Sequence, residues 1–422
     1  MAQLEFDGCK TLELAREYGT PLYVVSEAMI RQRLQTLNRD FMKKYPGSLA
    51  LFASKALLTL DICKIVASEG LGLDVVTGGE LYTAIKAGFP MERVYFHGNN
   101  KSEEELIMAL DHRVGRIVVD NQYELELLNE LAIQRGMRAP IMFRITPGVD
   151  SHTHKHITTG QIDSKFGMPL HTESKQVFMG AAMTMEGIDC WGFHFHVGSQ
   201  LHTNESHRKA TEILLNLVKE VKQDYGFETR ELNLGGGYGV RYNENDDPKP
   251  LHYFTDALMA DVEKLCGNLG LQMPKIVIEP GRWVVAEAGI TLYTLGAKKV
   301  IPGVRTYISV DGGMPDNPRP SLYDARYEAV VANRPDDPAN ELVTIAGKCC
   351  ETGDILIKDI SLQAPKPGDI LAVYTTGAYN HSMASNYNRL PRPAMVLVNK
   401  GTHRLSVRRE TYEDLLAREV LG

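Results

Sequence analysis

The sequence predicts an α/β fold, in which a closed (β/α)8 barrel is joined to a second, mainly β domain. Two observations carry this prediction. Short apolar runs alternate with helical patterns through the first two thirds of the chain, and past residue 290 short strand-like runs separated by Pro and Gly replace the helical periodicity. Strands that alternate with helices form parallel βαβ units. Eight such units favour a closed barrel.

Eight apolar runs are the candidate barrel strands. The first five begin 22 to 24 residues apart, the length of one strand, one helix and two turns, and the wider spacing of the last three indicates insertions. An open doubly wound sheet is the alternative, but its glycine fingerprint is missing after the first strand. In order, the eight runs begin at Ser48, Leu71, Arg93, Arg116, Pro140, Cys190, Glu231 and Lys275.

Capping signals support the helices between these strands. Ser102 with Glu105 has the spacing of a capping box, and Asn121 with Glu124 repeats it. Gly136 offers a helix stop after the second of them. The barrel is therefore expected over residues 28–288.

The mainly β domain is expected to comprise residues 289–422 together with residues 1–27. Its strand-like runs are bounded by Pro and Gly, and a short terminal helix is expected in ETYEDLLAREV. The runs are RTYISV, YEAVV, ELVTIAG, DILAVYTT and AMVLV.

Composition narrows the class of protein. The 422 residues include 46 Lys and Arg against 53 Asp and Glu, a net charge of −7 that argues against a nucleic-acid-binding surface. No apolar stretch approaches the ~20 residues that span a bilayer, and the N-terminus lacks a signal-peptide pattern. The six Cys form no C-x-x-C pair, which suits reduced thiols in a cytoplasmic protein.

Polar side chains follow the apolar strands at the barrel end where active sites lie. The first strand, SLALFAS, runs into Lys55, whose amine is expected to be partly desolvated, which favours its neutral, nucleophilic form. The alternative is a surface lysine at the start of a loop. The sixth strand ends in FHFHVGS, where alternation places His194 and His196 on one face.

These two histidines leave three interpretations open: zinc ligands, satisfied core residues or, for one of them, a ring that stacks on a flat ligand. A third zinc ligand is not evident from the sequence. The HTHKH stretch also resembles a metal site, but it lies in a polar loop. We therefore expect no metal either at the histidine pair or at His152, His154 and His156.

The seventh and eighth strands end in groups suited to a phosphate and a pyridine ring. LNLGGGYG places Gly235, Gly236 and Gly237 where backbone N–H groups can approach an anion, although glycine is also the usual turn residue. IVIEPGR places Glu279 in the barrel mouth, where its carboxylate needs a partner, either Arg282 or a protonated pyridine nitrogen. An amine, a flat ring, an anion cradle and this carboxylate together indicate pyridoxal 5'-phosphate as cofactor.

Motifs spread over nearly the whole chain resemble one family. LFASKALL, HFHVGSQ, LNLGGGYG and IEPGR are similar to the motifs of barrel-type, alanine-racemase-like decarboxylases that depend on pyridoxal phosphate. Four further segments resemble the diaminopimelate decarboxylases rather than the ornithine or arginine decarboxylases. They are HKHITTGQIDSKFGM, DGGMPDNPRPSLYDARYE, AGKCCETGDIL and TTGAYNHSMASNYNRLPRPA.

The resemblance implies roles at the cofactor. Lys55 would carry the cofactor as a Schiff base, His196 would stack on its ring, and Glu279 would keep the pyridine nitrogen protonated. Asp74 and Glu80 match family positions close to the lysine. The other implied cofactor-binding residues are Ser199, Gly235, Gly236, Gly237, Gly281, Arg282 and Tyr379.

The resemblance also implies roles at the substrate. Arg319 and Tyr323 match positions that bind its distal end, with Arg282 and Tyr379 beside it. Cys350 would be catalytic and Glu351 substrate-binding, and both match a pair that reaches the active site from a second subunit. The adjacent Cys349 leaves open which thiol faces the site, although the family register favours Cys350.

The function implied is the decarboxylation of meso-2,6-diaminopimelate to L-lysine and CO2, the last step of lysine biosynthesis, by a homodimer with shared active sites. The alternatives are a decarboxylase of another basic amino acid or amino-dicarboxylate, and a non-catalytic homologue. Arg319 argues against ornithine, whose second cationic end would face a guanidinium. Neither nucleic acid nor membrane is an expected partner.

Overall fold

The computed structural model describes residues 3–149, 164–170, 179–180 and 182–421. The chain divides into two compact units, of which the first contains a barrel and the second a mixed β-sheet. The barrel unit comprises residues 33–239 and 248–283, and the β unit comprises residues 1–32, 240–247 and 284–422.

The barrel unit confirms the predicted (β/α)8 barrel. All eight predicted strands form and pair in parallel, and the barrel closes where β10 pairs with β8. A short ninth strand, β9 (Met168–Pro169), extends β8. In barrel order the strands are β4 (Leu49–Ala53), β5 (Gly72–Val75), β6 (Val94–Phe96), β7 (Arg116–Val119), β8 (Ala139–Thr146), β10 (Ile188–His194), β11 (Glu231–Asn233) and β12 (Lys275–Ile278).

Buried apolar side chains from five of these strands fill the barrel interior. Leu51, Tyr95, Val118, Met142 and Val277 form one cluster, and none is more than 1% exposed. Near-continuous apolar runs are typical of parallel strands that are covered on both faces. This burial explains why all eight strands could be predicted from the sequence.

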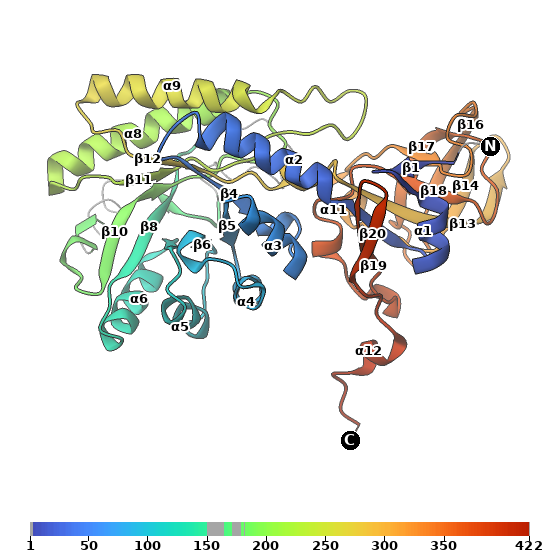
Figure 1. The fold of residues 1–422 in the computed structure, drawn as a ribbon, viewed down its shortest axis with the longest axis horizontal. Helices are drawn as coiled ribbons and strands as arrows, with labels where there is room; N and C mark the ends of the chain where they lie inside the picture. The colour runs from blue at the N-terminus through green and yellow to red at the C-terminus, as the bar shows by residue number, and fades with distance from the viewer. Residues whose placement is uncertain (1–2, 150–163, 171–178, 181, 422) are drawn as a thin grey trace. The chain divides into compact units, whose positions relative to one another are not determined.

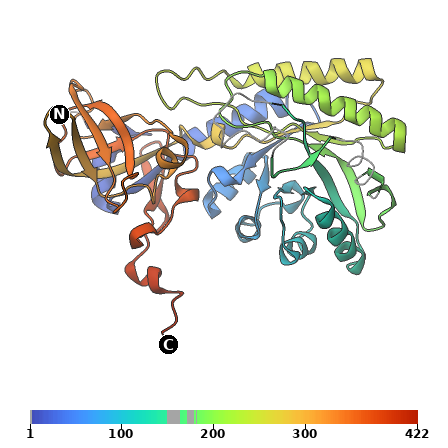
Figure 2. The same cartoon turned by 180° about the vertical axis from the view of Figure 1, so that it is seen from behind.

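Helices surround the barrel, and α8 and α9 lie side by side in both views (Figures 1 and 2). Arg208 of α8 and Asp261 of α9 form an ion pair between them. The helices are α2 (Glu27–Leu37), which continues from the β unit into the barrel unit, α3 (Leu60–Ser68), α4 (Gly78–Ala87), α5 (Glu103–Asp111), α6 (Gln122–Gln134), α8 (Glu205–Tyr225) and α9 (Leu251–Leu269).

The two predicted capping boxes differ in the structure. At α5 the box is complete, since Ser102 and Glu105 each accept the other's backbone N–H. At α6 the Asn121 side chain accepts the Glu124 N–H at 3.0 Å, but the Glu124 carboxylate instead accepts from Lys101 at 2.7 Å. The second box was therefore predicted wrongly, because a buried lysine takes the carboxylate.

The β unit is built around β3 (Leu22–Ser26), which comes from the N-terminal part of the chain. β3 pairs antiparallel with β13 (Gly289–Ile301) and parallel with β19 (Ala394–Asn399). The other strands are β1 (Glu5–Phe6), β2 (Cys9–Lys10), β14 (Arg305–Val310), β15 (Ala329–Val331), β16 (Glu341–Ala346), β17 (Ile355–Leu362), β18 (Ile370–Val373) and β20 (Thr402–Val407).

Short helices complete the β unit. The predicted terminal helix is present as α12 (Tyr412–Leu416), and α11 (Arg319–Tyr323), which the sequence did not suggest, carries two candidate residues. The others are α1 (Thr11–Tyr18) and α10 (Arg282–Val285), which begins in the barrel unit. Of the helices in the described part of the chain, none combines the length and the apolar character that crossing a membrane requires.

Candidate active site

Glu279 is the central charged group at the carboxyl ends of the barrel strands. It follows β12 and is 6% exposed. His97, directly after β6, lies 2.7 Å from Oε1, and His194, the last residue of β10, lies 3.2 Å from Oε2. Asn233, at the end of β11, donates its side-chain N–H to Oε1. Four strand ends therefore converge on one buried carboxylate.

These neighbours decide the charge of Glu279. Burial by itself would raise the pKa of this carboxyl, but His97 and His194 outweigh it and hold the pKa well below its usual value. Burial lowers the pKa of His194 to about 3, so that this imidazole is neutral near pH 7. The site thus keeps an ionised carboxylate in a buried position.

Lys55 and Asp74 form a second charged pair in the barrel unit. Lys55 Nζ lies 3.5 Å from Asp74 Oδ2, and the Asp74 side chain is 1% exposed. The Lys55 side chain, however, is 45% exposed and lies in a short 3-10 turn over Ser54–Ala56 rather than on β4. Lys55 therefore follows β4 by two residues, and its partial desolvation stays a prediction.

Glu80, the other carboxylate expected near the lysine, lies in the first turn of α4. Its Oε2 accepts the Val76 N–H at 2.7 Å. Burial raises the pKa of this carboxyl. Glu80 thus ties the end of β5 to the helix that follows it.

His196 follows the end of β10, and alternation predicted that it shares a face with His194. β10 ends at His194, so the strand geometry does not extend to His196. Its Nδ1 accepts the Gly236 N–H at 3.4 Å, and burial lowers its pKa well below the usual value. The shared face of the two histidines stays a prediction, and His194 contacts Glu279 at 3.2 Å.

The glycines after β11 allow their backbone to lie close to the backbone at Glu279 and Gly198. A Cβ at Gly236 would lie 2.1 Å from the Glu279 carbonyl oxygen, and one at Gly237 would lie 2.0 Å from that of Gly198. Gly235 and Gly237 also have positive φ angles of 70° and 96°. Only glycine suits these positions.

Ser199 and Arg282 form the remaining polar group of the barrel candidates. Arg282 donates from both Nε and Nη2 to Ser199 Oγ, at 3.3 and 3.2 Å, and the arginine is 6% exposed. Gly281, next to it, allows a close approach to β4, because a Cβ there would lie 2.9 Å from the Ala53 Cβ. A buried guanidinium beside a hydroxyl can bind an anion.

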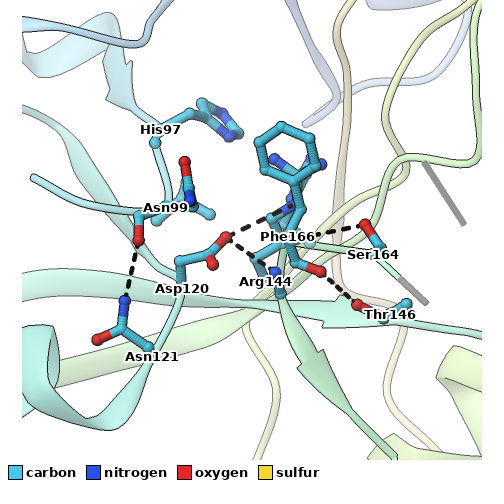
Figure 3. A network of polar contacts seen from close by, with 12 residues as sticks. His97, Asn99, Asp120, Asn121, Arg144, Thr146, Ser164 and Phe166 are labelled. Atoms are coloured by element: carbon cyan, nitrogen blue, oxygen red, sulfur yellow. Dashed lines mark hydrogen bonds and ion pairs between the residues drawn. The ribbon is translucent and has the colours of Figure 1, made fainter. Parts of the chain in front are cut away.

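Asp120 and Arg144 extend the charged layer beside His97 (Figure 3). Asp120 Oδ1 accepts the Gly167 N–H at 3.0 Å and lies 4.0 Å from Arg144 Nε. The Arg144 guanidinium lies over the Phe166 ring, 4.5 Å from its centroid. Burial raises the pKa of Asp120 and lowers that of Arg144.

These neighbours of the site were missed at the sequence level. His97 follows the third predicted strand in VYFHG, so the strand-end criterion that selected Glu279 would have found it. Asn233 and Arg144 lie within predicted strands, where no such criterion applied. Their roles depend on which strands are neighbours in the closed barrel.

The histidine and carboxylate atoms of this cluster also have metal-ligand spacing. Among the described residues, the ligand atoms of His97, His194 and Glu279 all lie within 4.8 Å of one another. In this group His97 and Glu279, rather than His196, accompany His194. His152, His154 and His156 lie outside the described residues.

The remaining candidates belong to the β unit. Arg319 is 7% exposed, donates to the Tyr327 hydroxyl, and lies 4.7 Å from the Tyr242 ring centroid. Tyr323, on the same short helix, and Tyr379, with a φ of 63°, are both half-buried. In the part of the chain that the structure describes, Arg319 has no carboxylate partner.

The two adjacent cysteines differ in exposure. Cys349 is half-buried, and burial together with Asp354 raises the pKa of its thiol to about 12. Cys350 is exposed, and its backbone N–H donates to Asn388 Oδ1 at 2.7 Å. Glu351 is also exposed. Cys350 is therefore the more accessible of the two thiols.

Comparisons with known proteins decide the family. The family described as "Pyridoxal-dependent decarboxylase, pyridoxal binding domain" matches residues 28–286. The diaminopimelate decarboxylase of Bacillus subtilis is 49% identical over 413 residues, which cover 98% of this chain and 94% of that protein. The chain belongs to the pyridoxal-dependent decarboxylase family. It is a carboxy-lyase whose cofactor is pyridoxal phosphate.

Solved structures of family members have the same fold. A diaminopimelate decarboxylase from M. jannaschii, in co-complex with L-lysine, has a TM-score of 0.93 and 35% identity, and the match covers 100% of this chain and 96% of that one. The enzyme from Helicobacter pylori complexed with L-lysine has a TM-score of 0.87 and 31% identity over 96% of this chain and 98% of that one.

The barrel residues fit the cofactor of a pyridoxal-dependent decarboxylase. Among the described residues, neither buried oxygen of Asp74 accepts a hydrogen bond. Glu279 offers an ionised carboxylate, and the glycines at 235–237 leave no side chain over the backbone. The Asp74 carboxylate lies 3.5 Å from Lys55, so an anion stands beside the amine that would carry the cofactor.

Proposed function

We propose that this enzyme decarboxylates meso-2,6-diaminopimelate to L-lysine and CO2. Relatives named diaminopimelate decarboxylase at 38–49% identity over nearly the whole chain support the reaction. The observation that carries the choice of substrate is Arg319, a buried guanidinium without a carboxylate partner in the described chain. A buried charge is costly unless it is paired, and the distal carboxylate of diaminopimelate would pair with it in a bidentate manner.

At the cofactor, we assign Lys55 to covalent attachment and Glu279 to holding the proton on the pyridine nitrogen. The low pKa of Glu279 supports this, because an ionised carboxylate stabilises a neighbouring N–H+. His196 would lie against the ring and Asp74 beside the lysine. The phosphate would be bound by Ser199, Gly235, Gly236, Gly237, Gly281, Arg282 and Tyr379.

Pyridoxal phosphate supplies the electron sink that accepts the electron pair left when CO2 departs. Around it, Glu279 keeps the ring nitrogen protonated, so that this sink stays strong throughout the reaction. Cys350 delivers a proton to the carbon that has lost CO2. Its exposure, in contrast to the half-buried Cys349, supports this assignment.

At the substrate, Arg319 would bind the distal carboxylate. The other proposed substrate-binding residues are Tyr323, Glu351, Tyr379 and Arg282. Ornithine or lysine would place an ammonium group against the guanidinium, which is unfavourable. A decarboxylase of another basic amino acid is therefore the weaker candidate.

We also propose a cytoplasmic homodimer in which Cys350 and Glu351 complete the site of the partner subunit. The six free thiols support a reducing compartment. The test is complementation between inactive Lys55→Ala and Cys350→Ala proteins under conditions of subunit exchange. About half of the dimers would be mixed, each with one intact site, so about a quarter of wild-type activity should return. Confirmed exchange without recovery would contradict shared sites.

The substrate is tested with separated stereoisomers of diaminopimelate. CO2 and L-lysine should form from the meso isomer, and lysine and ornithine should remain poor substrates. Turnover of ornithine above that of diaminopimelate would favour the other basic substrates. A protein that binds the cofactor, with its visible absorbance, but releases no CO2 from any of them would be the non-catalytic homologue.

A further inference from the structure

We infer that Asp354 is a positioning residue, whose single buried carboxylate orders both the Cys350 loop and the segment that leads into Arg319. The inference rests on the roles proposed above for these two residues. Asp354 is 3% exposed and immediately precedes β17. It lies at the end of the 347–354 loop, which joins β16 to β17.

The Asp354 carboxylate accepts one backbone N–H from each of two segments. Oδ1 accepts from Met314 at 2.7 Å, and Oδ2 accepts from Cys349 at 2.8 Å. Its backbone also closes the loop, since its carbonyl accepts the Gly347 N–H at 2.9 Å and its N–H donates to the Glu351 carbonyl at 3.1 Å. One residue thus makes four hydrogen bonds around the proposed catalytic thiol.

Two glycines make room for this carboxylate. A Cβ at Gly313 would lie 2.5 Å from Asp354 Oδ2, and a Cβ at Gly347 would lie 2.1 Å from the same atom. Neither glycine has a positive φ, so space rather than backbone conformation requires them. The two segments therefore pack directly on the carboxylate, and each lacks a side chain at the point of contact.

The same contacts connect the thiol loop to the arginine helix. Ser321 of α11, two residues after Arg319, donates from Oγ to the Gly353 carbonyl at 2.8 Å. At the other side of the loop, the Cys350 N–H donates to Asn388. Loop and helix are thus hydrogen-bonded to each other, and the Asp354 carboxylate holds the loop to Met314, which precedes the helix. A displaced carboxylate would therefore disturb both Cys350 and Arg319.

The test is Asp354→Asn in the full-length holoenzyme. Asparagine keeps the volume, but its NH2 group cannot accept a hydrogen bond, so the N–H of either Met314 or Cys349 loses its acceptor. We expect kcat to fall and KM for diaminopimelate to rise, with kcat/KM lower by at least about fivefold. The visible absorbance of the bound cofactor should persist.

Asp369→Asn is the matched control. Asp369 is another nearly buried carboxylate of the β unit, which accepts the Lys366 N–H at 2.8 Å and pairs with Arg334. Its replacement should lower stability without changing kcat or KM. Equal kinetic losses in both variants, or unchanged constants in Asp354→Asn, would overturn the positioning role.

Hydrogen exchange gives a measurement that is independent of activity. In Asp354→Asn, peptides that contain Met314 and Cys349 should exchange faster, while other peptides of the β unit keep their wild-type rates. Unchanged exchange in both peptides, or a rise across the whole unit equal to that in Asp369→Asn, would contradict the inference. If the wild type does not turn over diaminopimelate, the proposed function fails, and this measurement still decides the ordering by Asp354.

A double variant tests whether Asp354 acts through the thiol. In Asp354→Asn/Cys350→Ala, kcat should lie within about twofold of that of Cys350→Ala alone, because residues that act as a unit are not additive. A full further loss would show that Asp354 acts independently of Cys350. If Asp354→Asn does not fold, Gly313→Ala keeps the carboxylate but displaces it, and the same changes in kcat and KM are expected.

Discussion

Two buried carboxyl groups, one in each unit, have pKa values shifted in opposite directions. Glu279 in the barrel unit has a pKa well below the usual value, whereas the pKa of Asp316 in the β unit is raised to about 7. Burial raises the pKa in both. At Glu279 two imidazoles outweigh burial, whereas Asp316 is bonded to the Tyr293 hydroxyl and the Gly313 N–H and lies near other carboxylates.

The comparison shows that burial raises the pKa of a buried carboxyl group unless its partners outweigh it. Glu124 is an intermediate case, since it is 2% exposed and pairs with Lys101, yet burial still raises its pKa. One lysine does not outweigh desolvation there, and two histidines at Glu279 do. Of these three groups, Glu279, at which we propose that a pyridine nitrogen binds, is the one whose pKa is lowered.

The largest effect is expected from removing the negative charge at Glu279. Glu279→Gln keeps the shape but leaves the pyridine nitrogen without an ionised partner, so kcat should fall by about two orders of magnitude or more. The cofactor absorbance should remain. Glu228→Gln, on an exposed carboxylate paired with Lys222, is the control and should turn over normally. An unaltered rate in Glu279→Gln would remove this residue from the proposed role.

Lys101→Met should isolate the effect of burial on Glu124. Removing one partner of a buried ion pair destabilises a protein by about 3–5 kcal/mol. The unpaired Glu124 would bind a proton in the folded state, so the loss should be smaller at pH 5 than at pH 8. Trp191 and Trp283 both lie in the barrel unit, so their fluorescence during urea unfolding measures the stability of that unit. A loss that does not depend on pH would contradict this account.

Asp316→Asn should remove a pH dependence from the β unit. Because the folded pKa of about 7 exceeds the ordinary value near 3.8, stability is greatest below about pH 4 and falls as the pH rises to about 7. The free energy of unfolding should fall by at most about 1.4 kcal/mol for each pH unit in this range. Hydrogen exchange of β-unit peptides across this range should show a flatter profile in the variant. Asp337→Asn, at an exposed position, should keep the wild-type profile.

The smallest effect is expected at the buried cation of the β unit. Arg319→Lys keeps the charge but loses the planar fork, so KM for diaminopimelate should rise about tenfold while kcat changes little. Arg326→Lys, at an exposed position nearby, is the control. Unchanged kinetic constants in Arg319→Lys would place the distal carboxylate elsewhere.

The barrel could be predicted from the sequence because its strands are buried on both faces and recur with helices between them. Strands of the β unit were harder to predict for a physical reason. β20 is mostly exposed and polar, and β13 contains Gly296 and the exposed pair Lys298 and Lys299, so neither has a clear apolar pattern. Their pairing with distant strands, rather than local preference, makes them strands.

A residue of the candidate site could be predicted from the sequence only where a polar side chain or a glycine directly follows a predicted barrel strand. Glu279 and the glycines satisfied that criterion, and the family resemblance supplied the rest. The contacts between His97 and Glu279, and between Asp354 and Met314, join residues far apart in the sequence. Such contacts depend on strand order in the folded chain, which local patterns do not encode.

The central position of β3 has a consequence for synthesis of the chain. Tyr23 is opposite Thr291 on one side and Met395 on the other, so both neighbours of this strand emerge long after it. At ~5–20 residues per second, the first of them follows roughly 13–54 s later. Leu22, Val24 and Val25 are buried in the folded protein. Until β13 has been synthesised, their strand has no partner strand in the sheet. A fragment of residues 284–422 alone therefore lacks the strand around which its sheet assembles.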